Sequence, residues 1–159
     1  MATKLGKYGR SVSIIGVGCT PFQDTLENPE FSGITEGELF GRAALEAMKD
    51  AGIDSKDIDA YFHGQIGSAM SSRYLTPAIQ MMNWIGMHGK PCMHHDEGCA
   101  TGYMALELAV NAVASGKYNI VLSGGVEMIN SIPLADKPSY MRRKITSEEY
   151  VDWLDQLYD

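Results

Sequence analysis

Residues 91–125 read PCMHHDEGCATGYMALELAVNAVASGKYNIVLSGG and contain a strand, a helix and a second strand in succession. The segment 91–95 predicts the first strand and the apolar run at 119–123 the second. Between them, residues 98–115 predict a helix that is apolar on almost every side. This alternation indicates an α/β layer with a mostly parallel sheet. Ligand sites in such a layer lie at the carboxyl ends of the strands, and the turn that holds Cys99 is at such an end.

Four further elements are expected before this stretch. Residues 12–17, VSIIGV, form a short apolar run that predicts a buried strand. A helix is expected after Thr35, because Thr35 and Glu38 have the spacing of a capping box and Gly52 supplies a stop signal. The remaining two are a strand at residues 58–66 and a helical piece at residues 77–84.

The composition changes near residue 129, which suggests two regions. We expect an α/β domain over residues 1–128 and the beginning of a loop region over residues 129–159. The helix at 98–115 belongs to the first region and should be buried, because its polar stripe is narrow. In the second region, Thr146 and Glu149 form a capping box that predicts an amphipathic helix. Its expected apolar face consists of Tyr150, Trp153, Leu154, Leu157 and Tyr158.

The overall composition is that of an ordinary globular protein with a net negative charge. The chain has 159 residues, 45% of them hydrophobic, and a formal charge of -7. Neither nucleic acid nor a membrane surface is an expected partner, since both attract proteins with a basic excess. No apolar run reaches the roughly 18 residues that can span a bilayer, and the N-terminus lacks a secretory signal pattern. We therefore expect a cytoplasmic protein.

Cys99 is the candidate nucleophile. It follows Gly98 and opens the apolar helix, so its sulfur should lie near unpaired backbone N–H groups and the positive end of the helix dipole. That setting favours the thiolate form, which is the reactive one. The alternative interpretation of such a residue is a buried structural cysteine, because free cysteines are often buried.

A metal site is not expected, although several possible ligands are close together in the sequence. Strand alternation places Cys92, His94 and Asp96 on one face and His95 and Glu97 on the other. Cys99 completes this group, but it contains no paired spacing typical of a zinc site.

Two other sequence patterns bear on ligand binding. The basic cluster Arg142, Arg143 and Lys144 is a candidate for binding the phosphates of a nucleotide-bearing substrate, although such charge runs are usually solvated loops. Gly16 and Gly18 do not form a dinucleotide-binding fingerprint, because the third glycine is missing.

Two motifs resemble those of the thiolase family. Residues 97–110, EGCATGYMALELAV, resemble the family's nucleophile motif, in which Cys-Ala-Ser-Gly or a close variant begins a buried helix. Residues 122–133, LSGGVEMINSIP, resemble its Gly-Gly-Met-Glu-x-Met-Ser-x-x-Pro segment. Residues 12–22 and 44–59 also resemble the family, especially its branch related to sterol-carrier-protein thiolases. The resemblance covers nearly the whole chain and implies the N-terminal half of a thiolase, with a mostly parallel mixed sheet and the start of a loop domain.

The resemblance implies an acyl-CoA:CoA acyltransferase that works through an acyl thioester on Cys99. It would cleave 3-oxoacyl-CoA by thiolysis or run the reverse Claisen condensation, with coenzyme A and acyl-CoA as substrates and no permanently bound cofactor. It also implies a dimer formed through the strand at 91–95. Asp96 is a departure, because many thiolases have Asn there.

The larger departure is the family's second half. Its catalytic histidines and its Cys-x-Gly loop have no counterpart among His63, His88, His94, His95, Cys19 and Cys92. Full activity should therefore need a C-terminal half or a partner chain, in a homodimer or hetero-oligomer. Two alternatives remain open: a non-catalytic scaffold or acyl-CoA-binding subunit, and a condensing enzyme of the ketoacyl-synthase or hydroxymethylglutaryl-CoA-synthase type.

Overall fold

A three-stranded parallel sheet forms the centre of the protein. The structure is a computed structural model that describes residues 9–22, 28–31, 33–66 and 75–128. The strands are β1 (Ala60–Gly64), β2 (Cys92–His95) and β3 (Val121–Gly125), in the order β2-β1-β3. Both pairings are parallel, so the prediction of an α/β layer with a parallel sheet is confirmed. The observed strands differ from the predicted ranges by a few residues at their ends.

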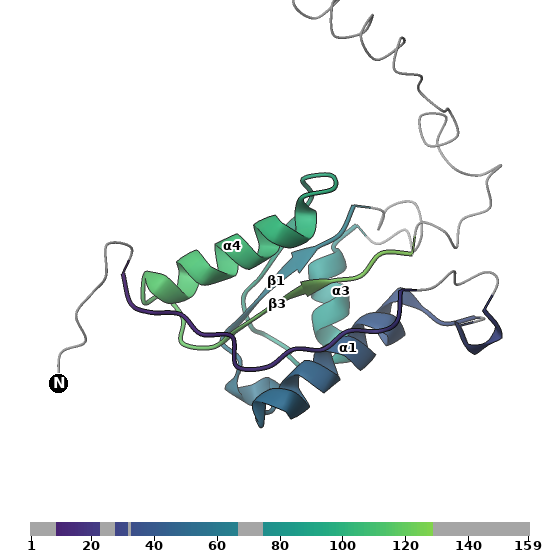
Figure 1. Cartoon of the computed structure of the whole chain (residues 1–159), viewed down its shortest axis with the longest axis horizontal. Coiled ribbons are helices and arrows are strands. Elements are labelled where there is room, and N and C mark those ends of the chain that lie inside the picture. The colour runs from purple at the N-terminus through teal and green to yellow at the C-terminus, as the bar shows by residue number, and fades with distance from the viewer. Residues whose placement is uncertain (1–8, 23–27, 32, 67–74, 129–159) are drawn as a thin grey trace, which may run out of the picture.

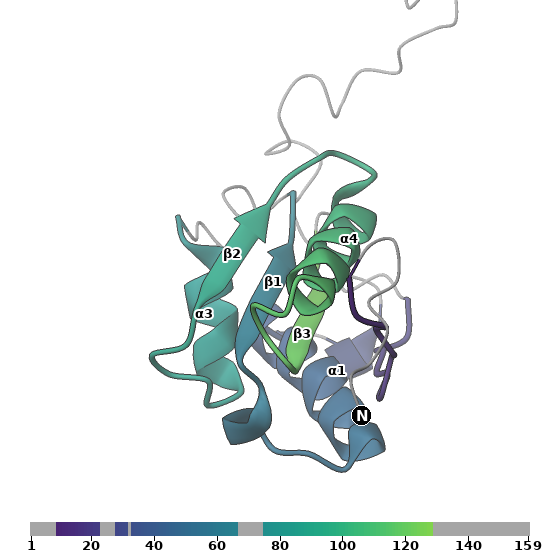
Figure 2. The ribbon, with the colours of Figure 1, turned by 90° about the vertical axis from the view of Figure 1, so that its left-hand side faces the viewer.

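Helices cover both faces of the sheet. Helix α4 (Thr101–Ala114) packs on one face, whereas α1 (Glu36–Ala51) and α3 (Pro77–Trp84) lie on the other (Figures 1 and 2). Every residue of β1 is buried, because β1 is the central strand between these two layers. The predicted helix at 77–84 is confirmed. Short 3₁₀ turns complete the described elements, at η1 (Pro29–Phe31) and η2 (Ser55–Asp57).

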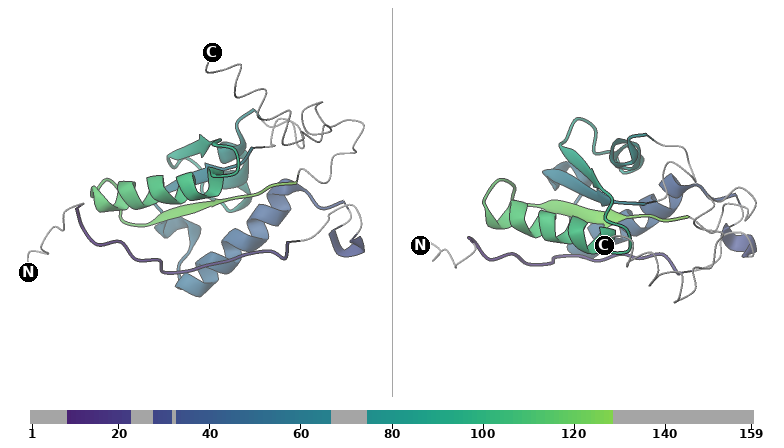
Figure 3. Two further views of the ribbon diagram at one scale, coloured as in Figure 1. Left: turned by 45° about the horizontal axis from the view of Figure 1, so that its top comes forward. Right: turned by 90° about the horizontal axis from the view of Figure 1, so that it is seen from above.

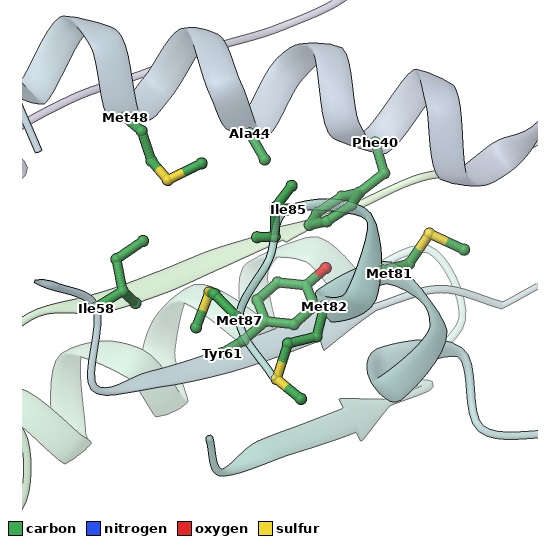
Figure 4. Close-up of a cluster of buried hydrophobic side chains, with 9 residues drawn as sticks. All are labelled: Phe40, Ala44, Met48, Ile58, Tyr61, Met81, Met82, Ile85 and Met87. Atoms are coloured by element: carbon green, nitrogen blue, oxygen red, sulfur yellow. The ribbon is translucent and has the colours of Figure 1, made fainter. Parts of the chain in front are cut away.

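The larger core cluster lies between the sheet and helices α1 and α3. Tyr61 of β1 is fully buried there, and its ring centroid lies 5.2 Å from that of Phe40 on α1. Figure 4 shows the methionines that fill the space around this pair. Methionine suits such a position because its flexible thioether side chain adapts to irregular gaps. The cluster consists of Phe40, Ala44, Met48, Ile58, Tyr61, Met81, Met82, Ile85 and Met87.

The ends of α1 follow the predicted signals. The Thr35 hydroxyl accepts a hydrogen bond from the backbone N–H of Glu38 at 3.1 Å, which is the N-terminal half of the capping box. The Glu38 carboxylate pairs with Arg42 at 2.7 Å. At the other end Gly52 has a φ of 69°, a left-handed conformation that costs glycine little.

The prediction of a buried strand at residues 12–17 is wrong. This segment is extended but unpaired, and Ile14 and Val17 are 74% and 66% exposed. It crosses α1 (Figure 3), and the N–H of Val17 donates to the Asp50 carboxylate at 3.0 Å. Gly16 allows this close crossing, since a Cβ there would collide with the backbone of α1. These contacts hold the segment on α1, and a cavity of about 710 Å³ lies between it and β3.

Arg10 joins this N-terminal segment to the far end of α4. Its backbone N–H donates to the Ala114 carbonyl at 3.0 Å, and its Nε donates to the Val113 carbonyl at 2.5 Å. Its guanidinium also binds the Tyr118 carbonyl and, at 2.9 Å, the side-chain oxygen of Asn119. Arg10 therefore adds hydrogen bonds to carbonyl groups at and just beyond the end of α4.

Helix α4 is shorter and less covered than the sequence predicts. It begins at Thr101, two residues after Cys99. Its sheet-facing side is buried at Ala105 and Ala109, as expected. Away from the sheet, Tyr103 is 67% exposed, and Leu106, which lines the cavity beside the N-terminal segment, is 43% exposed. The amphipathic helix and loop region expected after residue 128 lie outside the described residues. Within the described part, no helix combines the length and apolar character needed to cross a membrane.

Candidate functional site

Cys99 lies in a turn that connects the carboxyl end of β2 to α4. Its side chain is exposed. The buried Thr101 holds the turn closed: its hydroxyl accepts from the Glu97 N–H at 2.8 Å and donates to the Gly98 carbonyl at 2.7 Å. Gly98 has a φ of 56°, the left-handed conformation that the turn requires. The sequence-based placement of Cys99 at a strand end before an apolar helix is therefore correct, and the alternative of a buried cysteine does not hold.

The carboxyl ends of all three strands meet beside this turn. Gly64 of β1 is in register with both His95 of β2 and Gly125 of β3. Just beyond β3, the Glu127 carboxylate accepts a hydrogen bond from the Ile66 N–H at 2.9 Å, which ties the end of β3 to the end of β1. The segment that resembles the family's second motif thus lies at the same edge of the sheet as Cys99.

A chain of buried polar side chains runs along β1 toward this edge. The Tyr61 hydroxyl lies 2.5 Å from His63 Nδ1, and His63 Nε2 lies 2.9 Å from Gln65 Oε1. All three side chains are almost completely buried. The Gln65 carbonyl accepts from His94 Nε2 at 2.7 Å, and the Gln65 N–H donates to the His95 carbonyl at 3.3 Å. These contacts link the end of β1 to the residues that lead into the Cys99 turn.

Burial governs the protonation of this cluster. It lowers the pKa of His63 to about 4, against the opposing effect of the hydrogen bond to Gln65 and with a small contribution from His94. Burial also raises the pKa of Tyr61 well above its ordinary value. Both side chains are therefore neutral at pH 7. Sequence reasoning missed this cluster, and the available signal was the alternation of polar residues in a buried strand, Tyr61, His63 and Gln65.

The other two cysteines occupy different surroundings. Cys92 on β2 is partly buried, and this burial raises the pKa of its thiol. Cys19 is exposed in the extended N-terminal segment, and its thiol donates to the Thr20 carbonyl at 3.1 Å. Neither one is followed by a helix, so Cys99 alone combines exposure with a helix start within the described residues.

The predicted alternation of the histidines on β2 is confirmed. His94 faces His63, with ring centroids 5.6 Å apart, while His95 stacks on Phe62 at 6.3 Å on the opposite face. Across the part of the chain that the structure describes, no three His, Cys, Asp or Glu side chains come together as a metal site. The candidate phosphate-binding residues Arg142, Arg143 and Lys144 lie outside the described residues, so Cys99 is the predicted site residue that the structure places.

The fold and the site together define an α/β protein with a parallel sheet and an exposed cysteine in the turn after strand β2. Comparison with known proteins identifies its family. The chain matches the family described as "Thiolase, N-terminal domain" over residues 12–157. It therefore belongs to the thiolase family.

Individual relatives agree with this assignment. Acetyl-CoA acetyltransferase of Methanocaldococcus jannaschii is 35% identical over 123 residues, which are 77% of this chain and 30% of that protein. Sterol carrier protein 2 of Homo sapiens is 28% identical over 94% of this chain and 26% of its own length. The chain thus spans less than a third of these relatives.

A solved structure supports the fold. The crystal structure of 3-oxoacyl-[acyl-carrier-protein] synthase III from Aquifex aeolicus VF5 matches with a TM-score of 0.56 and 21% sequence identity. The match covers 63% of this chain and 32% of the other. At this level of identity the match shows a shared fold.

Proposed function

We propose that this chain is the nucleophile-bearing part of a thiolase-type acyltransferase and that Cys99 carries the acyl group. The observation that carries the proposal is the position of Cys99, which is exposed in a clamped turn directly before α4. Relatives named acetyl-CoA acetyltransferase support acyl-CoA and coenzyme A as the substrates. No permanently bound cofactor is required by this chemistry.

The reaction would proceed in two steps. The Cys99 thiolate attacks the 3-oxo carbonyl carbon of a 3-oxoacyl-CoA, and the bond between C2 and C3 breaks. Its electron pair leaves with the shorter acyl-CoA, which takes up a proton. The thiol of coenzyme A then attacks the thioester on Cys99, which releases the second acyl-CoA and restores the thiol. The backbone N–H of Cys99 is the proposed donor to the negative oxygen that develops in each step.

A partner or a C-terminal half would complete the site. Thiolysis needs a group that activates Cys99 and one that moves a proton to the leaving carbon. The exposed apolar side of α4, with Tyr103, Leu106 and Val110, supports a covering partner, because large apolar patches usually mark interaction surfaces. We place the α/β domain at residues 1–128 and a loop region at 129–159, in which Arg142, Arg143 and Lys144 would bind the phosphates of coenzyme A. The free state of all three cysteines supports a reducing compartment such as the cytoplasm.

Acylation by substrate tests the proposal directly. The protein, together with any co-purifying partner, is incubated with acetyl-CoA or acetoacetyl-CoA and analysed by intact-mass and peptide mass spectrometry. We expect one acetyl group on the peptide that contains Cys99. Cys99→Ala should abolish it, whereas the matched controls Cys19→Ala and Cys92→Ala should retain it. Acetylation of Cys19 or Cys92 in place of Cys99, or no acetylation of the complete assembly, would overturn the proposal.

A further inference from the structure

The polar chain along β1 has a fixed direction. The side-chain oxygen of Gln65 can only accept, so His63 Nε2 must carry the proton of their 2.9 Å hydrogen bond. Since His63 is neutral, its Nδ1 is then an acceptor, and the Tyr61 hydroxyl donates to it. The imidazole is thereby held in one tautomer by its two neighbours on the same strand.

The position of the Gln65 side chain, at the end of this hydrogen-bonded series, depends on His63. The Gln65 side chain is 1% exposed, and its Nε2 has no acceptor among the described residues. Among the described side chains, His63 is the partner of its oxygen. The backbone of Gln65 in turn contacts the last two residues of β2, through the His94 side chain at 2.7 Å and the His95 carbonyl at 3.3 Å. These two residues lead directly into the turn that holds Cys99.

We propose that Tyr61, His63 and Gln65 act as positioning residues for Cys99. Their directed hydrogen bonds fix the position of Gln65. The backbone of Gln65 in turn holds the His94 ring and the His95 carbonyl, and these contacts set the geometry of the Cys99 turn. None of the three needs to touch the substrate. The inference rests on the proposed function only in that Cys99 is taken as the reacting group.

Replacement of single hydrogen-bonding groups tests this role. Tyr61→Phe removes the donor to His63 but keeps the ring that packs on Phe40. Gln65→Met removes the acceptor and keeps a side chain of similar length. The matched control is Met81→Ala, which opens a cavity in the same core cluster without removing a hydrogen bond of the chain.

Two readouts are made on the whole protein. Nitrogen-15 NMR of the histidine ring reports the tautomer of His63, and mass spectrometry follows the rates at which Cys99 and Cys19 react with acetyl-CoA and with iodoacetamide. In the unaltered protein, His63 should show a protonated Nε2 and an unprotonated Nδ1 from pH 6 to pH 8. In Gln65→Met, His63 Nε2 loses its acceptor while the Tyr61 hydroxyl can either donate or accept, so this single-tautomer signal should be lost. In Tyr61→Phe, the Gln65 oxygen should keep the proton on Nε2, and the hydrogen bond at Nδ1 is removed. The rates at Cys99 should fall about ten- to a hundredfold, since small displacements of a reacting group have effects of this size.

Cys19, Met81→Ala and iodoacetamide serve as controls that distinguish a failed positioning role from a failed proposed function. The rate of Cys19 alkylation in every variant should stay within about twofold of its rate in the unaltered protein. Folded Met81→Ala should keep the Cys99 rates within the same limit, because this substitution should not displace the Cys99 thiol. The proposal is overturned if His63 carries its proton on Nδ1, if Cys99 reacts at its normal rate once the tautomer is lost, or if Met81→Ala slows Cys99 equally. If acetyl-CoA fails to react with the unaltered protein while iodoacetamide does, the proposed function fails and the iodoacetamide rates still decide the positioning role.

Discussion

Among single residues, Cys99 and His63 show how position determines chemistry. Cys99 is exposed because its turn projects from the end of the sheet, whereas His63 is enclosed because it lies on the central strand. Cys99 follows β2, and His63 lies on the neighbouring strand β1. Their different surroundings lead to separate expectations for reactivity and for stability.

Cys99 should be the first thiol to react with iodoacetamide at neutral pH. It is exposed before a helix, whereas burial raises the pKa of Cys92 and so reduces the thiolate fraction there. Brief labelling followed by peptide mass spectrometry gives the order of modification. Faster reaction at Cys19 or Cys92 in the assembled protein would contradict the assignment of Cys99 as the nucleophile.

Burial of His63 should make the protein less stable in acid. Its pKa falls from 6.5 to about 4 on folding, so the unfolded chain binds the extra proton as the pH drops. The contribution of neutral His63 is fully present above pH 6.5 and is lost between pH 6.5 and about 4. The loss should approach about 3 kcal/mol.

Urea unfolding at a series of pH values measures this loss. The variant His63→Asn, which has no titrating group in this range, should show a flatter pH dependence than the unaltered protein. Equal pH dependence in the two proteins would show that His63 is not the group responsible.

The secondary-structure elements that the sequence predicted correctly are those with strong local signals. The strand–helix–strand unit and the ends of α1 were predictable, because Thr35, Gly52 and the apolar runs act on their immediate neighbours. The segment 12–17 was mispredicted because its apolar pattern does not reveal the contact with Asp50, which lies 33 residues further along the chain. The chain from Tyr61 to Gln65 was missed for a related reason. Polar residues in a buried strand become meaningful only once their neighbours across the sheet are known.

The Thr35 cap should contribute measurably to the stability of α1. Thr35→Ala removes the acceptor for the Glu38 N–H and should lower the free energy of unfolding by about 1 kcal/mol. Thr35→Ser keeps the hydroxyl oxygen and should lose much less. Urea denaturation followed by circular dichroism compares the two variants. A Thr35→Ser variant as unstable as Thr35→Ala would show that the methyl group, and not the cap, is what matters.

For the molecule as a whole, two open surfaces determine how it should assemble. Strand β2 forms one edge of the described sheet, and α4 presents partly exposed apolar side chains at Tyr103, Leu106 and Val110. Unpaired edges and apolar patches both favour association with other chains. The first surface suits a second copy, and the second suits a covering domain or partner chain.

The chain should not be a monomer in solution. Pairing of β2 with its counterpart in a second copy would satisfy the unpaired backbone groups of this edge. Light scattering coupled to size-exclusion chromatography at micromolar concentration should give at least the mass of a dimer. A stable monomer under these conditions would contradict the prediction.

The chain alone should not turn over 3-oxoacyl-CoA, even if Cys99 is acylated. Proton transfer needs groups that are not recognisable near Cys99 in the described structure. The measurement is acetoacetyl-CoA cleavage by the purified chain, repeated with a co-expressed polypeptide that carries the missing histidines and the Cys-x-Gly loop. Restored turnover on mixing would support a divided enzyme, and rapid turnover by the chain alone would disprove the prediction.

The contact between Arg10 and the end of α4 also has a consequence for folding during synthesis. Arg10 is synthesised 103 residues before its partner Val113. At bacterial or eukaryotic translation speeds this interval lasts about 5 to 20 s. Val17 can bind Asp50 of α1 early in this interval, whereas the contacts of Arg10 must wait for the end of α4. The N-terminal segment can therefore take up its final position on α4 only after that helix has been synthesised.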